Sequence, residues 1–478
     1  MVGAIMEKTK ITFGEWLPDQ PGVTGALTQA ENCIPVANGY EPLHTEANFS
    51  SAAADTLLTT FAGKFAGVST LFAASSQKIY KYNGTTIALD AINTTGYTAT
   101  ESWDVTQFGS RMIIANGKEK LQSFTLNSSS AFADLSADSP TAKYVTVVRD
   151  FVVAGNAAGY ENKLYWCDIN DPTDWTPAST SQADTQVIAD GGDILGLTGG
   201  EFGIVLLEKA IYRMSYIGSP LFFQFDAISR SQGCLSAGSV VQYKNLTYFL
   251  ANDGFYVCNG QSVESISSQK INKWFFNNAA SNDIDQMSAT VDPIRELIIW
   301  CFPSQAGGNM LVFYSVPLQR WSYAFTTATS IAVTITPSVT LEALDNYSIS
   351  IEALTVSLDD RQWAGGNSIF SGVQGGRIIT FSGASKTASI ITGEIDIGRS
   401  VMTLARPIVD MGSGSVAVAA RNLLSDDITF TDLVPADSEG RCSIRRAGRY
   451  IRVETIPTGD DWKTAVGVEV DVVRQGAR

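Results

Sequence analysis

A short strand pattern that recurs six times between Phe65 and Phe325 constrains the fold of this chain most. Each copy contains two or more short apolar runs separated by Gly, Asn or Asp, for example Leu246–Ala251 followed by Gly254–Cys258. Six copies over this span give a period of about 40–45 residues, the size of one β-propeller blade. Because a propeller closes small sheets into a ring, it leaves few sheet edges free and surrounds a central channel.

The remaining residues divide around this propeller body, which we predict to span 61–330. Residues 1–60 predict an extended N-terminal arm with the first strands, in which two prolines follow Trp16 and leave that side chain exposed. Residues 331–375 break the repeat and predict an irregular insertion. Residues 376–478 alternate apolar and polar positions, which is typical of half-buried antiparallel strands. The sequence therefore predicts an all-β protein, with a six-bladed β-propeller-like body and a C-terminal antiparallel β-sandwich-like domain whose first strands can complete a blade.

One helix is expected inside the body, near residues 268–277. Ile271, Trp274 and Phe275 are spaced three and four residues apart there, as on one face of a helix. Apolar runs elsewhere fall well short of the ~20 residues that a membrane helix needs, so no membrane insertion is expected. The N-terminus lacks the basic start and apolar stretch of a secretory signal.

The six cysteines, at positions 33, 167, 234, 258, 301 and 442, are widely spaced and form no Cys-x-x-Cys pair. This spacing does not predict a disulfide framework or a zinc site. We expect buried thiols, in a protein assembled in a reducing cytoplasm.

The net charge of −15 is unevenly distributed. Residues 399–478 contain 11 basic and 11 acidic residues, whereas residues 1–398 contain 22 basic and 37 acidic residues. An acidic body argues against a conventional nucleic-acid binder, which neutralises phosphates with Lys and Arg. It is compatible with a conduit whose negative wall repels DNA and lets it slide.

Catalytic and metal-binding chemistry find little support in the residues. His44 is the single histidine and is expected at the surface or in a turn. Asp168, Asp171 and Asp174 contain part of a calcium-loop pattern, but a turn in which they bond their own backbone explains them as well. The Gly-rich run 191–203 lacks the Lys-Ser/Thr of a phosphate loop. We predict no catalytic residue, no metal and no cofactor.

Arg441, Arg445, Arg446, Arg449 and Arg452 form the only dense basic cluster of the sequence. Residues two apart share a face of a strand, so Arg441, Arg445 and Arg449 are expected to line one side of a sheet or its turn. The cluster is either a solvated face balanced by acidic neighbours or a docking surface for an acidic partner. Arg441, Arg445, Arg446 and Arg449 are the candidate partner-docking residues.

The order of several segments resembles the tail hub, or nozzle, proteins of short-tailed bacteriophages, which are related in role to the packaged-DNA stabilisation protein. The resemblance covers nearly the whole chain, although none of its motifs is a catalytic signature. It is found in residues 16–21, 33–40, 166–177, 208–218 and 233–261, and again in Gly398-Arg, Arg406-Pro, Ala420-Arg-Asn, Gly440-Arg-Cys, Gly448-Arg-Tyr, Trp462 and Gly467-Val-Glu-Val-Asp.

This resemblance implies a structural virion protein of the phage tail, not an enzyme. Family members form homohexameric rings below the adaptor that sits on the portal. The ring continues the channel for double-stranded DNA, retains the genome until ejection, and carries fibres and a needle or plug. The implied partners are therefore other copies of the chain, the adaptor, tail fibre and needle proteins, and transiting DNA that is bound without sequence specificity.

A second hypothesis is a carbohydrate-binding or glycan-cleaving propeller, such as a receptor-binding tail protein. Glycan cleavage requires two facing carboxylates, and a single sequence does not identify which Asp or Glu residues face each other.

Overall fold

The computed structural model describes residues 6–20, 25–93, 96–336, 365–459 and 462–474. Within these ranges the regular structure is β-strand except for helix α1 (Asn272–Asn278) and two 3-10 turns, η1 (Ala237–Ser239) and η2 (Ser281–Gln286). The all-β fold class is confirmed, and α1 overlaps the helix expected near residues 268–277. No helix in the described ranges combines the length and apolar character that crossing a membrane requires.

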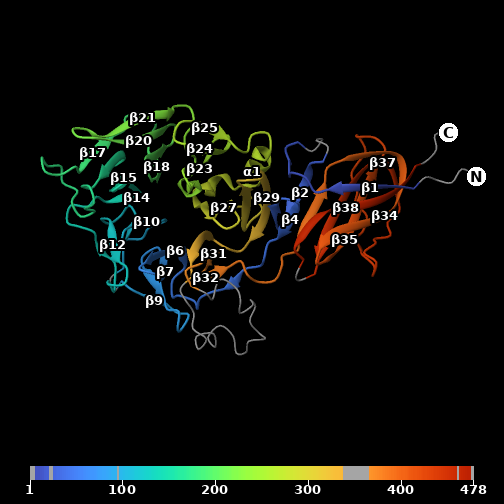
Figure 1. The fold of residues 1–478 in the computed structure, drawn as a ribbon, viewed down its shortest axis with the longest axis horizontal. Coiled ribbons are helices and arrows are strands. Elements are labelled where there is room, and N and C mark those ends of the chain that lie inside the picture. Colours follow the sequence, from blue (N-terminus) through green and yellow to red (C-terminus); the bar gives the residue numbers. More distant parts are fainter. Residues whose placement is uncertain (1–5, 21–24, 94–95, 337–364, 460–461, 475–478) are drawn as a thin grey trace, which may run out of the picture.

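Six separate four-stranded antiparallel sheets form the blades of a β-propeller (Figure 1). Five of them follow one another in the chain: β6 (Leu57–Phe65), β7 (Val68–Ser75), β8 (Ile79–Tyr82), β9 (Leu89–Ala91); β10 (Asp104–Phe108), β11 (Arg111–Ala115), β12 (Gln122–Thr125), β13 (Ala133–Asp134); β14 (Ala142–Val148), β15 (Phe151–Ala157), β16 (Tyr160–Trp166), β17 (Asp184–Val187); β18 (Ile194–Thr198), β19 (Gly203–Leu207), β20 (Ile211–Gly218), β21 (Phe222–Ser229); β22 (Val241–Tyr243), β23 (Leu246–Ala251), β24 (Gly254–Cys258), β25 (Val263–Ser265).

The sixth blade is assembled from distant parts of the chain. It contains β30 (Ser330–Ile335), β31 (Ser368–Gln374) and β32 (Arg377–Thr380), and its outer strand β5 (Ala47–Asn48) comes from the N-terminal region. The predicted irregular insertion, 331–375, therefore needs correction at both ends, where strands of this blade lie. Residues 337–364 of that prediction lie outside the described residues.

Local chemistry explains why the repeat folds into hairpins. Ala66 and Gly67 connect β6 to β7 as a two-residue turn, and both have positive φ, 50° and 83°. Such turns twist in the same sense as the strands that they join, and glycine adopts positive φ without a steric penalty. The apolar runs between turns become the buried strands, as in β19, which is buried along its whole length.

A large mixed sheet of 14 strands adjoins the blades. Its path includes β26 (Ser288–Asp292), β27 (Leu297–Pro303), β28 (Asn309–Ser315), β29 (Arg320–Thr326), β2 (Leu27–Glu31), β33 (Ser389–Thr392), β37 (Arg446–Thr458), β34 (Ile395–Asp410), β38 (Thr464–Arg474), β4 (Gly39–Pro42) and β3 (Cys33–Val36), with β1 (Met6–Thr12), β35 (Ser413–Arg421) and β36 (Val434–Pro435) attached at its sides. The expected C-terminal domain thus corresponds to β33–β38, which share one sheet with N-terminal strands.

The first four strands of this sheet, β26–β29, are an antiparallel meander that occupies a blade position in the ring. The meander joins the rest of the sheet through the parallel pairing of Glu31 with Tyr323. The six predicted repeat copies therefore fall on the five successive blades from β6–β9 to β22–β25 and on the meander β26–β29, which belongs to the large sheet; no predicted copy corresponds to the blade that contains β30.

Neighbouring units share buried apolar side chains all the way around the ring, which closes it. These shared contacts occur within six clusters: Phe72 with Met112; Ile113 with Val145 and Val205; Ile204 with Phe249; Tyr248 with Trp300; Leu297 with Ile331; and Leu71 with Val373. Burial between blades is the main stabilising term of such a ring, because a single four-stranded sheet cannot cover its own apolar faces.

The N-terminal segment runs between the two regions and is not an exposed arm (Figure 1). The expectation of an exposed Trp16 is wrong: its side chain is 0% exposed. Its ring packs 4.7 Å from Trp274 and 5.0 Å from Tyr323, and its Nε1 donates to the carbonyl of Thr28.

Candidate partner-docking site

The four candidate docking arginines do not line one strand face. Arg446 and Arg449 lie on β37, whereas Arg441 and Arg445 precede this strand in irregular chain. The expected face of Arg441, Arg445 and Arg449 is therefore corrected, because the two-residue alternation applies only within a strand.

Two of these arginines are ion-paired within the chain. Arg441 contacts Asp437 at 3.3 Å and Glu439 at 2.7 Å, and Arg449 contacts Asp396 at 2.9 Å. Hydrogen bonds from the Arg449 guanidinium lower the pKa of the Asp396 carboxyl, and the Arg441 backbone N–H lowers the pKa of Asp437. These arginines hold turns of the C-terminal sheet and have less capacity for a partner.

Arg445 and Arg446 are exposed and have no ion-pair partner among the described residues. A third arginine, Arg399, is likewise exposed and unpaired there, in the bulge of β34 that lies against Gly448 of β37. The sequence reading missed Arg399 because it is 46 positions away from Arg445 in the chain. The structure thus brings together three unpaired cations, two predicted and one not.

Arg452, the fifth arginine of the cluster, is half-buried on β37 between the buried Ile451 and Val453. Burial lowers the pKa of its guanidinium, the Glu394 carboxylate opposes this, and the neighbouring Arg421 adds to the lowering. The Arg452 Nε is buried without a hydrogen-bond partner among the described residues. Arg421 itself forms a two-pronged contact with Glu394, with Nε to Oε1 and Nη2 to Oε2 both at 2.5 Å. This pair fixes the end of β35, whose last residue is Arg421.

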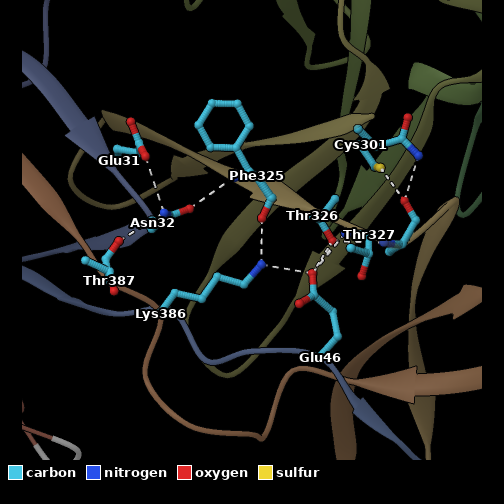
Figure 2. Close-up of polar contacts among 11 residues, drawn as sticks. Glu31, Asn32, Glu46, Cys301, Phe325, Thr326, Thr327, Lys386 and Thr387 are labelled. Atoms are coloured by element: carbon cyan, nitrogen blue, oxygen red, sulfur yellow. Dashed lines mark hydrogen bonds and ion pairs between the residues drawn. The ribbon is translucent and has the colours of Figure 1, made fainter. Parts of the chain in front are cut away.

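The second polar cluster, which the sequence did not indicate, joins the propeller to the C-terminal region (Figure 2). Lys386 and Glu46 form an ion pair at 2.9 Å, and their side chains are only 13% and 11% exposed. The same Glu46 oxygen accepts from the Thr326 hydroxyl at 2.6 Å and the Thr327 backbone N–H at 3.2 Å. Lys386 also donates to the Phe325 carbonyl at 2.6 Å.

Opposing effects set the pKa of Glu46. Burial alone raises it, but hydrogen bonds from Thr326 and Lys386 outweigh burial, and the pKa is lowered from its usual value. The group therefore remains ionised and tied to three segments that are distant in sequence. Asn32 completes the junction, since its Nδ2 donates to the Thr387 carbonyl and its Oδ1 accepts from the Phe325 N–H (Figure 2).

The other residues that were considered for chemistry have local structural roles. Asp171 accepts from the N–H and hydroxyl of Thr173, and Asp174 accepts from the N–H of Thr176, as in turns in which aspartates bond nearby backbone. His44 Nδ1 lies 3.0 Å from the Gly383 carbonyl. Within the described part of the chain, no group of three or more His, Cys, Asp or Glu residues is arranged to hold a metal ion.

The comparisons with known proteins are limited to fold. No protein-family model matches the chain, and no curated protein matches it. Among solved structures, the Pan2 WD40 domain of Neurospora crassa aligns with 73% of this chain and 97% of its own length, at 8% identity and a TM-score of 0.40. The computationally designed Ika8 protein aligns with 74% and 96%, at 10% identity and a TM-score of 0.36. The assignment of a propeller rests on the strand pairing described above.

Proposed function

We propose that this chain is a structural virion protein: a tail hub, or nozzle, of a short-tailed bacteriophage, and not an enzyme. Six copies would form a ring in the virion tail, after assembly in the host cytoplasm. The ring would extend the channel of the portal and its adaptor, retain packaged DNA and conduct it during ejection. Tail fibre and needle proteins would attach to it.

The proposal is supported by the positions, in the fold, of the motifs that resemble the tail hub proteins. Five residues from these motifs are each at most 2% exposed and belong to one core that the meander β26–β29 shares with the C-terminal strands: Trp16, Cys33, Tyr40, Cys442 and Trp462. Part of the resemblance is therefore found in buried residues that join the two regions, and these residues specify an architecture.

Charge supports the conduit part of the proposal. The acidic residues are in excess outside the C-terminal strands, where 37 acidic residues face 22 basic ones over positions 1–398. Double-stranded DNA carries a negative charge every ~1.7 Å, so a basic lumen would bind it and slow its passage. Acidic side chains that face the lumen of the assembled ring would repel it.

Electron microscopy of the purified chain tests the ring. A six-fold ring with a central hole is the expected result, and a uniform population of monomers at high protein concentration contradicts the proposal.

The role of the ring as a DNA conduit is tested by replacing lumen-facing carboxylates with Lys once the structure of the ring is known. Intact particles that release DNA more slowly are expected, whereas unchanged release rates mean that the acidic balance serves solubility.

One observation favours the second hypothesis, a receptor- or carbohydrate-binding propeller. A cleft of about 340 Å³ lies between the first two blades and is lined by hydroxyl, amide and ammonium groups, with Ser69, Thr70, Lys81, Asn127 and Ser129 among them. The Ser69 hydroxyl is buried there and has no hydrogen-bond partner among the described residues. Titration with host-surface glycans, followed by NMR of the bound sugar, tests it: saturable binding that Lys81→Ala and Ser69→Ala abolish supports a glycan receptor.

A further inference from the structure

The outer strands of five successive blades each contain one acidic residue and no Lys or Arg. These residues are Asp90 on β9, Asp134 on β13, Asp184 on β17, Asp226 on β21 and Glu264 on β25, and we call them the acidic rim. All but the partly buried Asp184 are exposed. None of the five forms an ion pair with a described residue; for example, Asp134 and Asp226 accept only from the side-chain amides of Gln122 and Gln224.

Protection of sheet edges explains part of this pattern. A charged side chain on an outer strand discourages pairing with another chain, and natural proteins use Lys for this role especially often. Either sign of charge serves that purpose. Lys81 and Arg213 lie opposite Asp90 and Asp226 on the neighbouring strands, whereas Asp134, Asp184 and Glu264 have no cation opposite them. A cationic partner surface supplies a reason for the uncompensated carboxylates beyond edge protection.

The C-terminal sheet presents such a surface at the end that we call the arginine end, defined by Arg399, Arg445 and Arg446. Strand pairing locates the arginine end. Arg446 is the first residue of β37. Ser400, which follows Arg399, pairs with Gly448 near the start of β37 and with Arg474 at the end of β38. β1 begins and β38 ends near this side of the sheet, since Met6 pairs with Val473, and both strands lie in the part of the large sheet that is away from the blades (Figure 1). The arginine end is therefore free of the propeller of its own chain.

Apolar side chains lie beside these arginines. Leu423 and Leu424 are 62% and 60% exposed and follow Arg421, the last residue of β35, which pairs with Tyr450 near the start of β37. Asp426 and Asp427, on the same turn, are exposed carboxylates without an ion pair among the described residues, and Asp426 accepts from the backbone N–H groups of Asn422 and Leu423. Three unpaired cations and two exposed leucines against these two carboxylates leave a surface with a small excess of basic charge and an apolar part, which suits an acidic protein partner.

We infer that the arginine end of one copy docks on the acidic rim of a second copy. The two surfaces differ, so the contact is heterologous, and repeating it generates a closed ring or an open filament. A two-fold contact between arginine ends is disfavoured by repulsion of like charges. The inference rests on the proposed ring and specifies which surfaces build it.

The test begins with Arg445→Glu/Arg446→Glu in the full chain, with sedimentation and native mass spectrometry at low and high salt. We expect the concentration needed for assembly to rise about tenfold or more, while the circular dichroism spectrum and thermal unfolding stay as in wild type. Wild-type assembly should weaken with added salt, because exposed charges are screened. Arg441→Glu is the matched control, since that arginine is already paired with Asp437 and Glu439.

Five single variants, each replacing one rim carboxylate with Lys, identify the docking blade. We expect one or two adjacent blades to weaken assembly as strongly as the double arginine variant, and the others to behave as wild type. Combining the effective rim variant with Arg445→Glu/Arg446→Glu should restore assembly. Leu423→Ser/Leu424→Ser gives a charge-neutral check and should weaken assembly at both salt concentrations.

Different experimental results would contradict the docking contact and the ring proposal. Rings that form normally from the arginine variant, or from all five rim variants, overturn the docking contact and leave the hub proposal standing. A wild-type chain that stays monomeric at all concentrations overturns both.

Discussion

The propeller and the C-terminal strands bury their apolar side chains in different ways. In the propeller, strands of two to nine residues form small sheets, and core clusters lie where neighbouring units meet. In the C-terminal region, β34, β37 and β38 are 16, 13 and 11 residues long, and β38 also pairs with β1 and β4 from the N-terminal segment. The propeller is built from contacts between successive strands, and the C-terminal region from contacts across the whole sequence.

The two regions also differ in how many of their charged side chains form ion pairs. Exposed carboxylates of the acidic rim have no ion pairs among the described residues, whereas Arg421, Arg441, Arg449 and Arg474 of the C-terminal region each pair with an acid. Some of these pairs join distant positions, such as Arg474 with Glu7. The two regions are joined by the N-terminal segment that lies between them and by direct contacts such as the hydrogen bond from Lys386 to the Phe325 carbonyl. The predictions below test that coupling.

Trp16→Ala should have the largest effect. Replacing a fully buried tryptophan with alanine costs about 3–5 kcal/mol, and this side chain packs against Trp274 and Tyr323 where the two regions meet. We expect urea unfolding to split into two transitions, one for each region. Trp166→Ala is the matched control, since Trp166 is 2% exposed but lies within a blade. A single shared transition in both variants would show that the regions are coupled by other contacts.

Lys386→Met should have the next largest effect. Removing the cation leaves Glu46 mostly buried with only its Thr326 and Thr327 donors, which we expect to lower the free energy of unfolding by about 2–3 kcal/mol. The double variant Glu46→Gln/Lys386→Met should recover most of this loss, because no unpaired charge remains. Lys244→Met breaks the exposed pair with Glu296 and should cost less than about 1 kcal/mol. Equal losses in the two lysine variants would contradict a special role for the junction.

Much of the propeller is predictable from sequence because its contacts are local. Hairpins such as β6–β7 have glycine turns and apolar runs next to each other in the chain, so the repeat predicts the units in order. The sixth blade is not predictable in this way, since its outer strand β5 pairs with β32, more than 300 positions later. The junction of Glu46, Thr326 and Lys386 has no local signature for the same reason, and Arg399 joins Arg445 only through the pairing of β34 with β37.

Asp104 gives a test of the pH dependence of the propeller. Burial on the inner strand β10 raises its pKa to about 7, although its carboxylate accepts from the backbone N–H groups of Val105 and Val145. The folded chain therefore binds this proton more tightly than the unfolded chain does, and its contribution to stability falls as pH rises from about 4 to about 7. Asp104→Asn should flatten that part of the stability–pH curve.

Asp396 in the C-terminal region should give the opposite pH dependence of stability. Hydrogen bonds from Arg449 lower its pKa, so its contribution is present above the ordinary carboxyl range and is lost as pH falls through its lowered value. Asp396→Asn should change stability in acid in the opposite sense to Asp104→Asn. The measurement is urea denaturation from pH 3 to pH 8, and parallel curves for the two variants would refute the difference between the regions.

His44→Ala should have the smallest effect. The imidazole lies 3.0 Å from the Gly383 carbonyl, near the junction but outside the Glu46–Lys386 pair, and loss of one such hydrogen bond costs about 1 kcal/mol or less. We predict that no hydrolase activity depends on this residue, because its ring contacts a backbone carbonyl and not a nucleophile or a carboxylate. We expect the variant to assemble and to support infection as wild type does. Particles that assemble normally but have lost infectivity would show that the single histidine acts in a step beyond assembly.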